Sequence, residues 1–281
     1  MQNEVHHFYS LLEQKRYITP ILNKIIETFQ QDKTTIIGIQ GGQGTGKTTL
    51  AQYLQGRLRE QGYKVESFSI DDFYETYPKR QQLAQQYSNN PFYQISRGMP
   101  GTHRIKKLLQ TLKNINAGKS FTIPHFDKAL HQGAGDIKYE RRVKEKQDFI
   151  LFEGWCVGIP VVSMKDFSAI CRKNKINIKG VDPTLKYSRV VIKFIKQYQP
   201  LWKYLNYTIM LKPLSSDLHL RWRLQQEKEL REKRGEGMSK EAVGYFVDMY
   251  LPWTYVCYDK VKAGTILEIN QQHHFSNIIF K

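Results

Sequence analysis

The chain has 281 residues, of which 40% are hydrophobic and 12% aromatic, so it can bury a substantial core and does not have the composition of a disordered protein. Its 43 Lys and Arg against 26 Asp and Glu give a net charge of +17. That charge favours anionic partners such as nucleotides, phosphorylated metabolites or nucleic acid, although a basic surface that meets only water would give the same value.

Three cysteines lie far apart in the sequence, at Cys156, Cys171 and Cys257. This spacing supports neither a zinc knuckle nor a disulfide framework. No stretch approaches the length of a membrane span, and the first residues lack the pattern of a signal peptide. We therefore expect a cytoplasmic protein without a membrane partner; the oligomeric state is left open.

The spacing of apolar residues, taken in chain order, predicts strands that alternate with helices. Strands are expected at residues 34–40, 64–70, 148–152, 207–211 and 265–269. Helices are expected at residues 8–31, 47–61, 74–88, 103–114, 187–204, 215–233 and 239–261, with loops at 89–102 and 122–136. Ser239 is the expected N-cap of the last helix. Such alternation predicts an α/β fold with a mostly parallel sheet.

We interpret residues 1–281 as a single domain. It comprises an N-terminal helical extension at 1–33, a basic and irregular surface excursion at about 165–186, and a lid-like basic helix at about 215–237.

A glycine-rich string follows the first expected strand and opens the first helix after it. It reads GGQGTGKTT and supplies the candidate nucleotide-binding residues Gly41, Gly42, Gln43, Gly44, Thr45, Gly46, Lys47, Thr48 and Thr49. Glycines let successive backbone N–H groups turn toward phosphate oxygens, and the helix adds its positive end. In a P-loop, the lysine contacts the β- and γ-phosphates and the threonine hydroxyl binds Mg²⁺. A plain connecting loop is the competing interpretation, but strand, loop and helix in this order predict binding of ATP and Mg²⁺.

Acidic residues end two of the expected strands. Asp71 and Asp72 follow the second strand, and Asp71 is the candidate to accept a proton from an attacking hydroxyl or to position it. Glu153 ends the strand at 148–152 and is the candidate to support Mg²⁺ with Thr48. Solvated turns or helix caps are the alternatives for these carboxylates. Ligands in open α/β sheets bind at this edge, which favours the catalytic interpretation.

The basic helix at 215–233 carries arginines that would offset charge on a transferred phosphate. Arg221, Arg223, Arg231 and Arg234 are the candidates, and Gly235 and Gly237 would form a hinge. A helix face exposed only to water is the competing interpretation.

Several strings together resemble the P-loop D-glycerate 3-kinases, a branch of the phosphoribulokinase, uridine kinase and pantothenate kinase group. The resemblance runs from about residue 35 to 260. It is carried by GGQGTGKTT, SIDDFY, RGMPGTH, the FDK and GAGD strings, FEGWCVG, YQPLW, WRLQQE and GMSKEAVGYFVDMYLP. It implies a three-layer P-loop NTPase fold with a helical lid.

The resemblance also implies transfer of the γ-phosphate of ATP to D-glycerate, giving 3-phosphoglycerate. Asp71 then falls at the position of the catalytic base, with Lys47 and Arg223 as further catalytic candidates, and Glu153 at the Walker B position. Candidate residues for the acceptor are Asp72, Tyr74, Arg97, His103 and Lys128.

Three residues depart from the family's pattern, and all lie in the expected acceptor region. They are Arg104 after PGTH, Ala129 after the FDK lysine, and Ile137 after GAGD. Kinases of another hydroxylated metabolite, such as uridine or pantothenate, are therefore the first alternative. A P-loop ATPase stimulated by nucleic acid is a further alternative, but the sequence has neither a guanine-binding NKxD string nor an RNP-like string. A nucleotide-binding protein that has lost catalysis is a third, although Lys47, Asp71 and Glu153 are all present.

Overall fold

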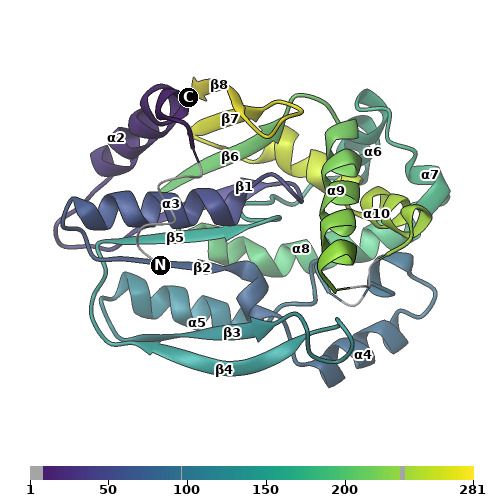
Figure 1. Ribbon diagram of the computed structural model, residues 1–281. Coiled ribbons are helices and arrows are strands. Elements are labelled where there is room, and N and C mark those ends of the chain that lie inside the picture. The colour runs from purple at the N-terminus through teal and green to yellow at the C-terminus, as the bar shows by residue number, and fades with distance from the viewer. Residues whose placement is uncertain (1–8, 96, 235–237) are drawn as a thin grey trace.

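The computed structural model describes residues 9–95, 97–234 and 238–281. A six-stranded sheet forms its centre, with the strand order β2–β5–β1–β6–β7–β8 (Figure 1). The strands are β1 (Thr35–Gly41), β2 (Val65–Ser69), β5 (Phe149–Gly154), β6 (Tyr207–Pro213), β7 (Thr265–Ile269) and β8 (Phe275–Phe280). Neighbouring strands run parallel except that β8 is antiparallel to β7. The mostly parallel sheet predicted from the sequence is confirmed.

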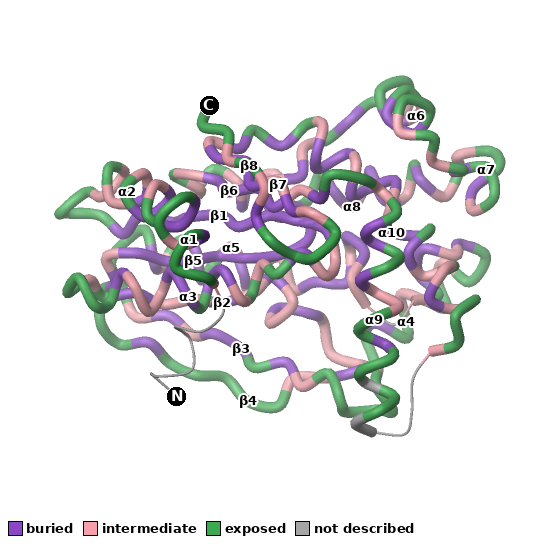
Figure 2. The backbone as a smooth tube through the Cα atoms, turned by 45° about the horizontal axis from the view of Figure 1, so that its top comes forward, coloured by how far each residue is buried: buried purple, intermediate pink, exposed green. Residues whose placement is uncertain are grey.

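Alternate residues of the central strands enter different cores. On β1, Ile36 belongs to one buried cluster, whereas Ile37 and Ile39 belong to the other. Helices α2 (Thr19–Glu27) and α3 (Lys47–Glu60) cover one face of the sheet. The other core is built with α5 (Ile105–Asn116), α8 (Lys186–Trp202) and α10 (Lys240–Lys260). The three-layer arrangement is confirmed, and the buried strands run between the helical layers in Figure 2.

The N-terminal helical segment begins with α1 (Leu11–Glu13), continues through a π-helical stretch (Gln14–Ile18) and passes into α2. Its apolar side chains, among them Ile21 and Ile25, are buried against the α3 side of the sheet. The expected helix at 8–31 thus corresponds to residues 11–27. No helix in the described ranges combines the length and the apolar character that crossing a membrane would require.

The expected loop at 122–136 was wrong. The chain forms strand β3 (Phe121–Asp127), a turn at 128–135, and strand β4 (Asp136–Val143), which pair as an antiparallel hairpin outside the main sheet. Alternation of Phe121 and Ile123 as buried residues is the strand signal, and Pro124 concealed it. Strand β8 was also not predicted.

The stretch at 165–186 is not an irregular excursion. It contains α6 (Met164–Lys173) and α7 (Ile178–Val181), and α6 packs against α10. Phe167, Ile170 and Cys171 are buried in the core, whereas the lysines and arginines of the stretch are exposed. The basic residues therefore mark the outer faces of two helices.

Two further helices frame the carboxyl edge of the sheet. Helix α4 (Tyr77–Gln86) follows the 3₁₀ turn Ile70–Phe73, and a second short 3₁₀ turn, Pro91–Tyr93, lies in the expected loop at 89–102. Helix α9 (Asp217–Arg234) is the expected basic helix. The Ser239 hydroxyl accepts a hydrogen bond from the Ala242 N–H, which confirms the predicted cap of α10. The proposed glycine hinge lies outside the described residues.

Candidate active site

The P-loop connects β1 to α3, and side chains of the loop donate hydrogen bonds to its own backbone. Gly44 and Gly46 have φ angles of +75° and +83°, which explains why glycine stands there. The Lys47 Nζ donates to the Gly42 carbonyl at 2.8 Å. Burial lowers the pKa of the Lys47 ammonium, and the carboxylates of Glu153 and Asp71 offset part of that effect. Among the described residues, this half-buried ammonium makes no hydrogen bond to a carboxylate, which suits it to receive phosphate oxygens.

The outer side of the P-loop is held by residues that the sequence reasoning missed. The Gly42 N–H donates to the Tyr258 hydroxyl at 2.9 Å, and a Cβ at Gly42 would lie 2.2 Å from His219 Cε1. His273 Nε2 lies 3.1 Å from the Gly44 carbonyl. Burial lowers the pKa of His219 to about 4, so this ring is neutral at pH 7. No local motif marks these contacts, because each joins the loop to a residue more than 170 positions away.

Thr48 and Glu153 come together beneath the P-loop. The Thr48 hydroxyl donates to Glu153 Oε1 at 3.0 Å, and Glu153 is 7% exposed. No group of three or more His, Cys, Asp or Glu side chains in the described residues has metal-site geometry. Mg²⁺ in nucleotide sites takes one or two protein oxygens and completes its shell with phosphates and water, so this hydroxyl–carboxylate pair fits Mg²⁺.

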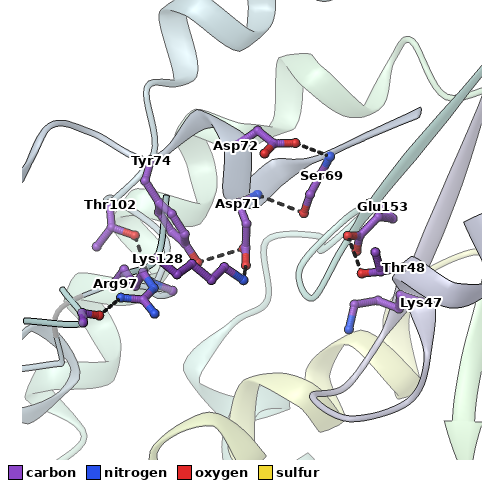
Figure 3. Close-up of polar contacts among 12 residues, drawn as sticks. Lys47, Thr48, Ser69, Asp71, Asp72, Tyr74, Arg97, Thr102, Lys128 and Glu153 are labelled. Carbon is purple, nitrogen blue, oxygen red and sulfur yellow. Dashed lines mark hydrogen bonds and ion pairs between the residues drawn. The ribbon is translucent and has the colours of Figure 1, made fainter. Parts of the chain in front are cut away.

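Asp71 sits across from the P-loop, at the carboxyl end of β2 (Figure 3). Its Oδ1 accepts from the Tyr74 hydroxyl at 2.8 Å, and its Oδ2 accepts from Lys128 Nζ at 2.9 Å. Burial alone would raise the pKa of Asp71, but Lys128, His103 and the Tyr74 hydroxyl together outweigh it and hold the pKa below its usual value. Asp71 is therefore an ionised carboxylate at pH 7, with both oxygens occupied by donors.

Asp72 has a structural contact of its own. Its Oδ2 accepts from the Ser69 N–H at 2.9 Å, while the Ser69 hydroxyl accepts from the Asp71 N–H at 3.1 Å. This reciprocal cap fixes the 3₁₀ turn that presents Asp71. Burial raises the pKa of Asp72 to about 6, with Asp71 and Glu153 adding to the rise. A role of Asp72 in acceptor binding stays a prediction.

Aromatic rings support Asp71 from behind. The Tyr74 ring stacks on His103 with centroids 4.5 Å apart and meets Phe126 edge-on at 5.0 Å. His103 Nδ1 lies 2.7 Å from the Tyr198 hydroxyl, which also accepts from the Gly101 N–H at 3.0 Å. Burial lowers the pKa of His103 to about 4. The ring is therefore neutral at pH 7 and packs against Tyr74, and a role of His103 in acceptor binding stays a prediction.

Arg97 and Lys128 are two of the cations predicted to bind the acceptor. The Arg97 Nη1 donates to the Gly133 carbonyl, and the Arg97 carbonyl accepts from the Tyr250 hydroxyl at 2.7 Å. The Lys128 side chain is 58% exposed, so it can leave Asp71 for a ligand. In Figure 3 the Arg97, Tyr74 and Lys128 side chains gather on the same side of Asp71.

The three departures from the family pattern do not contact Asp71. The Arg104 guanidinium pairs with Glu140 at 3.2 Å. The Ala129 and Ile137 N–H groups donate to the carboxylates of Asp127 and Asp136 through the backbone, a contact that any residue except proline makes.

Arg223 is held within the helical pair α9 and α10. It pairs with Glu227 one turn along its own helix, and its guanidinium carbon lies 5.1 Å from the Phe246 ring centroid. None of its contacts given by the described residues involves Lys47, Asp71 or Glu153. The structure therefore does not bring this catalytic candidate to the others, and its role stays a prediction.

Comparisons with known proteins show to which kinases this chain is similar. The family model described as Phosphoribulokinase / Uridine kinase family matches residues 36–170. An uncharacterized kinase of Schizosaccharomyces pombe, mug58, is 34% identical over 250 residues, which cover 85% of this chain and 87% of that protein. The chloroplastic D-glycerate 3-kinase of Arabidopsis thaliana is 32% identical over 77% of this chain, and the match spans 46% of its length.

Solved structures show the same fold. The D-glycerate 3-kinase of Cryptococcus neoformans superposes with a TM-score of 0.82 at 24% identity, covering 97% of this chain and 100% of that one. The P-loop kinase fold and the resemblance drawn from the sequence motifs are thereby confirmed. This chain belongs to the phosphoribulokinase/uridine kinase family of P-loop kinases, and a D-glycerate 3-kinase is among its relatives.

Proposed function

We propose that this kinase transfers the γ-phosphate of Mg-ATP to D-glycerate and forms 3-phosphoglycerate and ADP. The observation that carries the proposal is the arrangement of Asp71, an ionised carboxylate that faces the P-loop lysine and is paired with the exposed cation Lys128. The names of relatives that act on D-glycerate add support.

Nucleotide binding in this proposal rests on the P-loop. Its backbone N–H groups and Lys47 take the phosphates, and Thr48 with Glu153 would hold Mg²⁺. The bound metal would supply positive charge for the phosphate oxygens. Lys47 neutralises part of the charge on the γ-phosphate without a competing carboxylate hydrogen bond.

Acceptor binding rests on Lys128 and Arg97. Each oxygen of Asp71 now accepts one hydrogen bond and can accept another, and Oδ2 becomes most open to the acceptor hydroxyl when Lys128 leaves it. Lys128 is the exposed donor, and the carboxylate of glycerate would attract it. Asp71 Oδ2 is then free to orient the hydroxyl, whose oxygen forms the new P–O bond as the bond from the γ-phosphorus to ADP breaks. Asp71 accepts the proton. Binding of an anionic acceptor would thus draw Lys128 away from the Asp71 carboxylate, which the acceptor hydroxyl needs as its hydrogen-bond partner.

Kinase activity toward another hydroxylated metabolite is the second candidate. Its support is partial: a uridine kinase of Macrococcus caseolyticus is 30% identical over 43% of this chain. A neutral acceptor such as uridine would leave Lys128 on Asp71, which favours the anionic acceptor.

The test is acceptor-dependent release of ADP by the purified protein with Mg-ATP. D-glycerate should support turnover, whereas L-glycerate, uridine, pantothenate, ribulose 5-phosphate and single-stranded RNA should not. Turnover with RNA and with none of the small acceptors would overturn the kinase proposal.

A matched pair of lysines tests how the acceptor is held. Lys128→Ala should raise the KM for D-glycerate at least about tenfold, the loss of one charge-assisted contact. Lys138→Ala removes an equally exposed lysine that pairs with Asp127 instead, and should leave that KM unchanged. Equal effects of the two variants would remove Lys128 from the acceptor site.

A further inference from the structure

The turn between β3 and β4, residues 128–135, carries Lys128 but has little core of its own. Its residues from Lys128 to Gly133 are exposed, and Leu130 is 37% exposed. Apolar burial therefore does not fix where this turn stands. The side chains outside the hairpin that contact this turn make hydrogen bonds, an ion pair and an aromatic contact with it.

Arg80 of α4 makes the largest set of these contacts. It is 5% exposed, and its Nη1 donates to the Ala134 carbonyl at 2.8 Å while its Nη2 donates to the Gly135 carbonyl. Its Nε donates to the Glu75 carbonyl at 2.9 Å, next to the turn that bears Asp71. One guanidinium thus joins the backbone near Asp71 to the backbone of the Lys128 turn, a geometry that lysine cannot reproduce.

Neighbouring residues add further contacts to those that Arg80 makes with the turn. Arg97 donates to the Gly133 carbonyl, so the two arginines hold three successive carbonyls. The Phe126 ring lies 5.1 Å from the Arg80 guanidinium carbon. Gly135 has a φ of +75°, and a Cβ there would lie 2.3 Å from Phe126, so the turn closes directly onto this ring.

We propose that Arg80 is a positioning residue, which sets the Lys128 ammonium over Asp71 by clamping the far end of the turn to α4. Its hydrogen bonds to Glu75, Ala134 and Gly135 all end on backbone carbonyls, and it acts through the backbone of the turn. The consequence for catalysis rests on the function proposed above, whereas the placement of Lys128 does not.

The placement is tested without any substrate, by amine labelling of the intact protein and mass spectrometry. Lys138 lies in the same hairpin, is as exposed as Lys128 and pairs with a residue of the hairpin itself, so it serves as the internal reference. Arg80→Gln should raise the ratio of Lys128 to Lys138 labelling several-fold, and Arg80→Lys should raise it less. Asp71→Asn, which removes the partner of Lys128, gives the ratio for a fully released lysine.

An unchanged ratio in Arg80→Gln, beside a raised ratio in Asp71→Asn, would overturn the proposal. Global loosening does not imitate the expected result, because it exposes both lysines alike. If Arg80→Gln does not fold, judged by thermal unfolding, Arg80→Lys alone decides by the same ratio.

A double-mutant cycle then links placement to turnover. Arg80→Lys should raise the KM for D-glycerate about three- to tenfold with a smaller change in the KM for ATP. The same substitution in a Lys128→Ala protein should have no further effect, because the group that it positions is gone. Additive effects would show a general structural role and refute the proposal. If D-glycerate supports no turnover at all, the proposed function fails, while the labelling ratio still judges Arg80.

Discussion

The buried histidine behind the site predicts how stability depends on pH. Burial lowers the pKa of His103 from about 6.5 to about 4, so the folded protein binds a proton less readily than the unfolded chain. Stability that is present above pH 6.5 is therefore lost as the pH falls toward 4. The difference of about 2.5 pKa units corresponds to about 3 kcal/mol in total, of which about 2 kcal/mol is lost by pH 5.

The assay is urea unfolding at several values between pH 7.5 and 4.5, for the wild type and for His103→Asn. The wild type should lose about 2 kcal/mol more than the variant between pH 7.5 and 5. His219, with a pKa also near 4, and Asp72, whose raised pKa works in the opposite direction, are present in both proteins and cancel. Parallel profiles for the two proteins would refute the account of His103 as a neutral, buried ring.

Three further predictions follow from local geometry. Gly135→Ala should destabilise the protein by about 2 kcal/mol or more in urea unfolding, whereas Gly133→Ala should cost about 1 kcal/mol. Both glycines have a positive φ, but of the two only Gly135 has no room for a Cβ. Thr48→Val should raise the Mg²⁺ concentration for half-maximal turnover about tenfold, and an unchanged requirement would remove the hydroxyl from the metal site. Lys47→Ala should lower kcat/KM for ATP by orders of magnitude, which initial rates at varied ATP would measure.

The parallel strands of the central sheet and the P-loop were predictable because their signals are local. An apolar strand, a glycine-rich loop and an amphipathic helix within 30 residues specify the β1–α3 unit. Asp71 and Glu153 were found since parallel strands end at one edge of the sheet, and the structure brings both near Lys47. The candidate acceptor residues came from the family motifs and their order in the chain, and they stay predictions.

The missed features depend on tertiary contacts or on obscured periodicity. The spacing of Phe167, Ile170 and Cys171 is helical, but the basic residues around them concealed it. The sequence suggests only that Arg80 is one more charge on a polar helix, and the role proposed for it depends on hydrogen bonds to residues 54 and 55 positions away. His219 and Tyr258 likewise meet the P-loop only in the fold.

The most direct measurement of the central claim is ³¹P NMR of Mg-ATP and D-glycerate incubated with the wild type and with Asp71→Asn. The account predicts 3-phosphoglycerate and ADP in equal amounts with the wild type. It predicts a rate lower by at least about a hundredfold with Asp71→Asn, because positioning and proton acceptance are lost together, while ATP affinity stays within a few-fold. Inorganic phosphate in place of 3-phosphoglycerate, or equal rates for the two proteins, would contradict it.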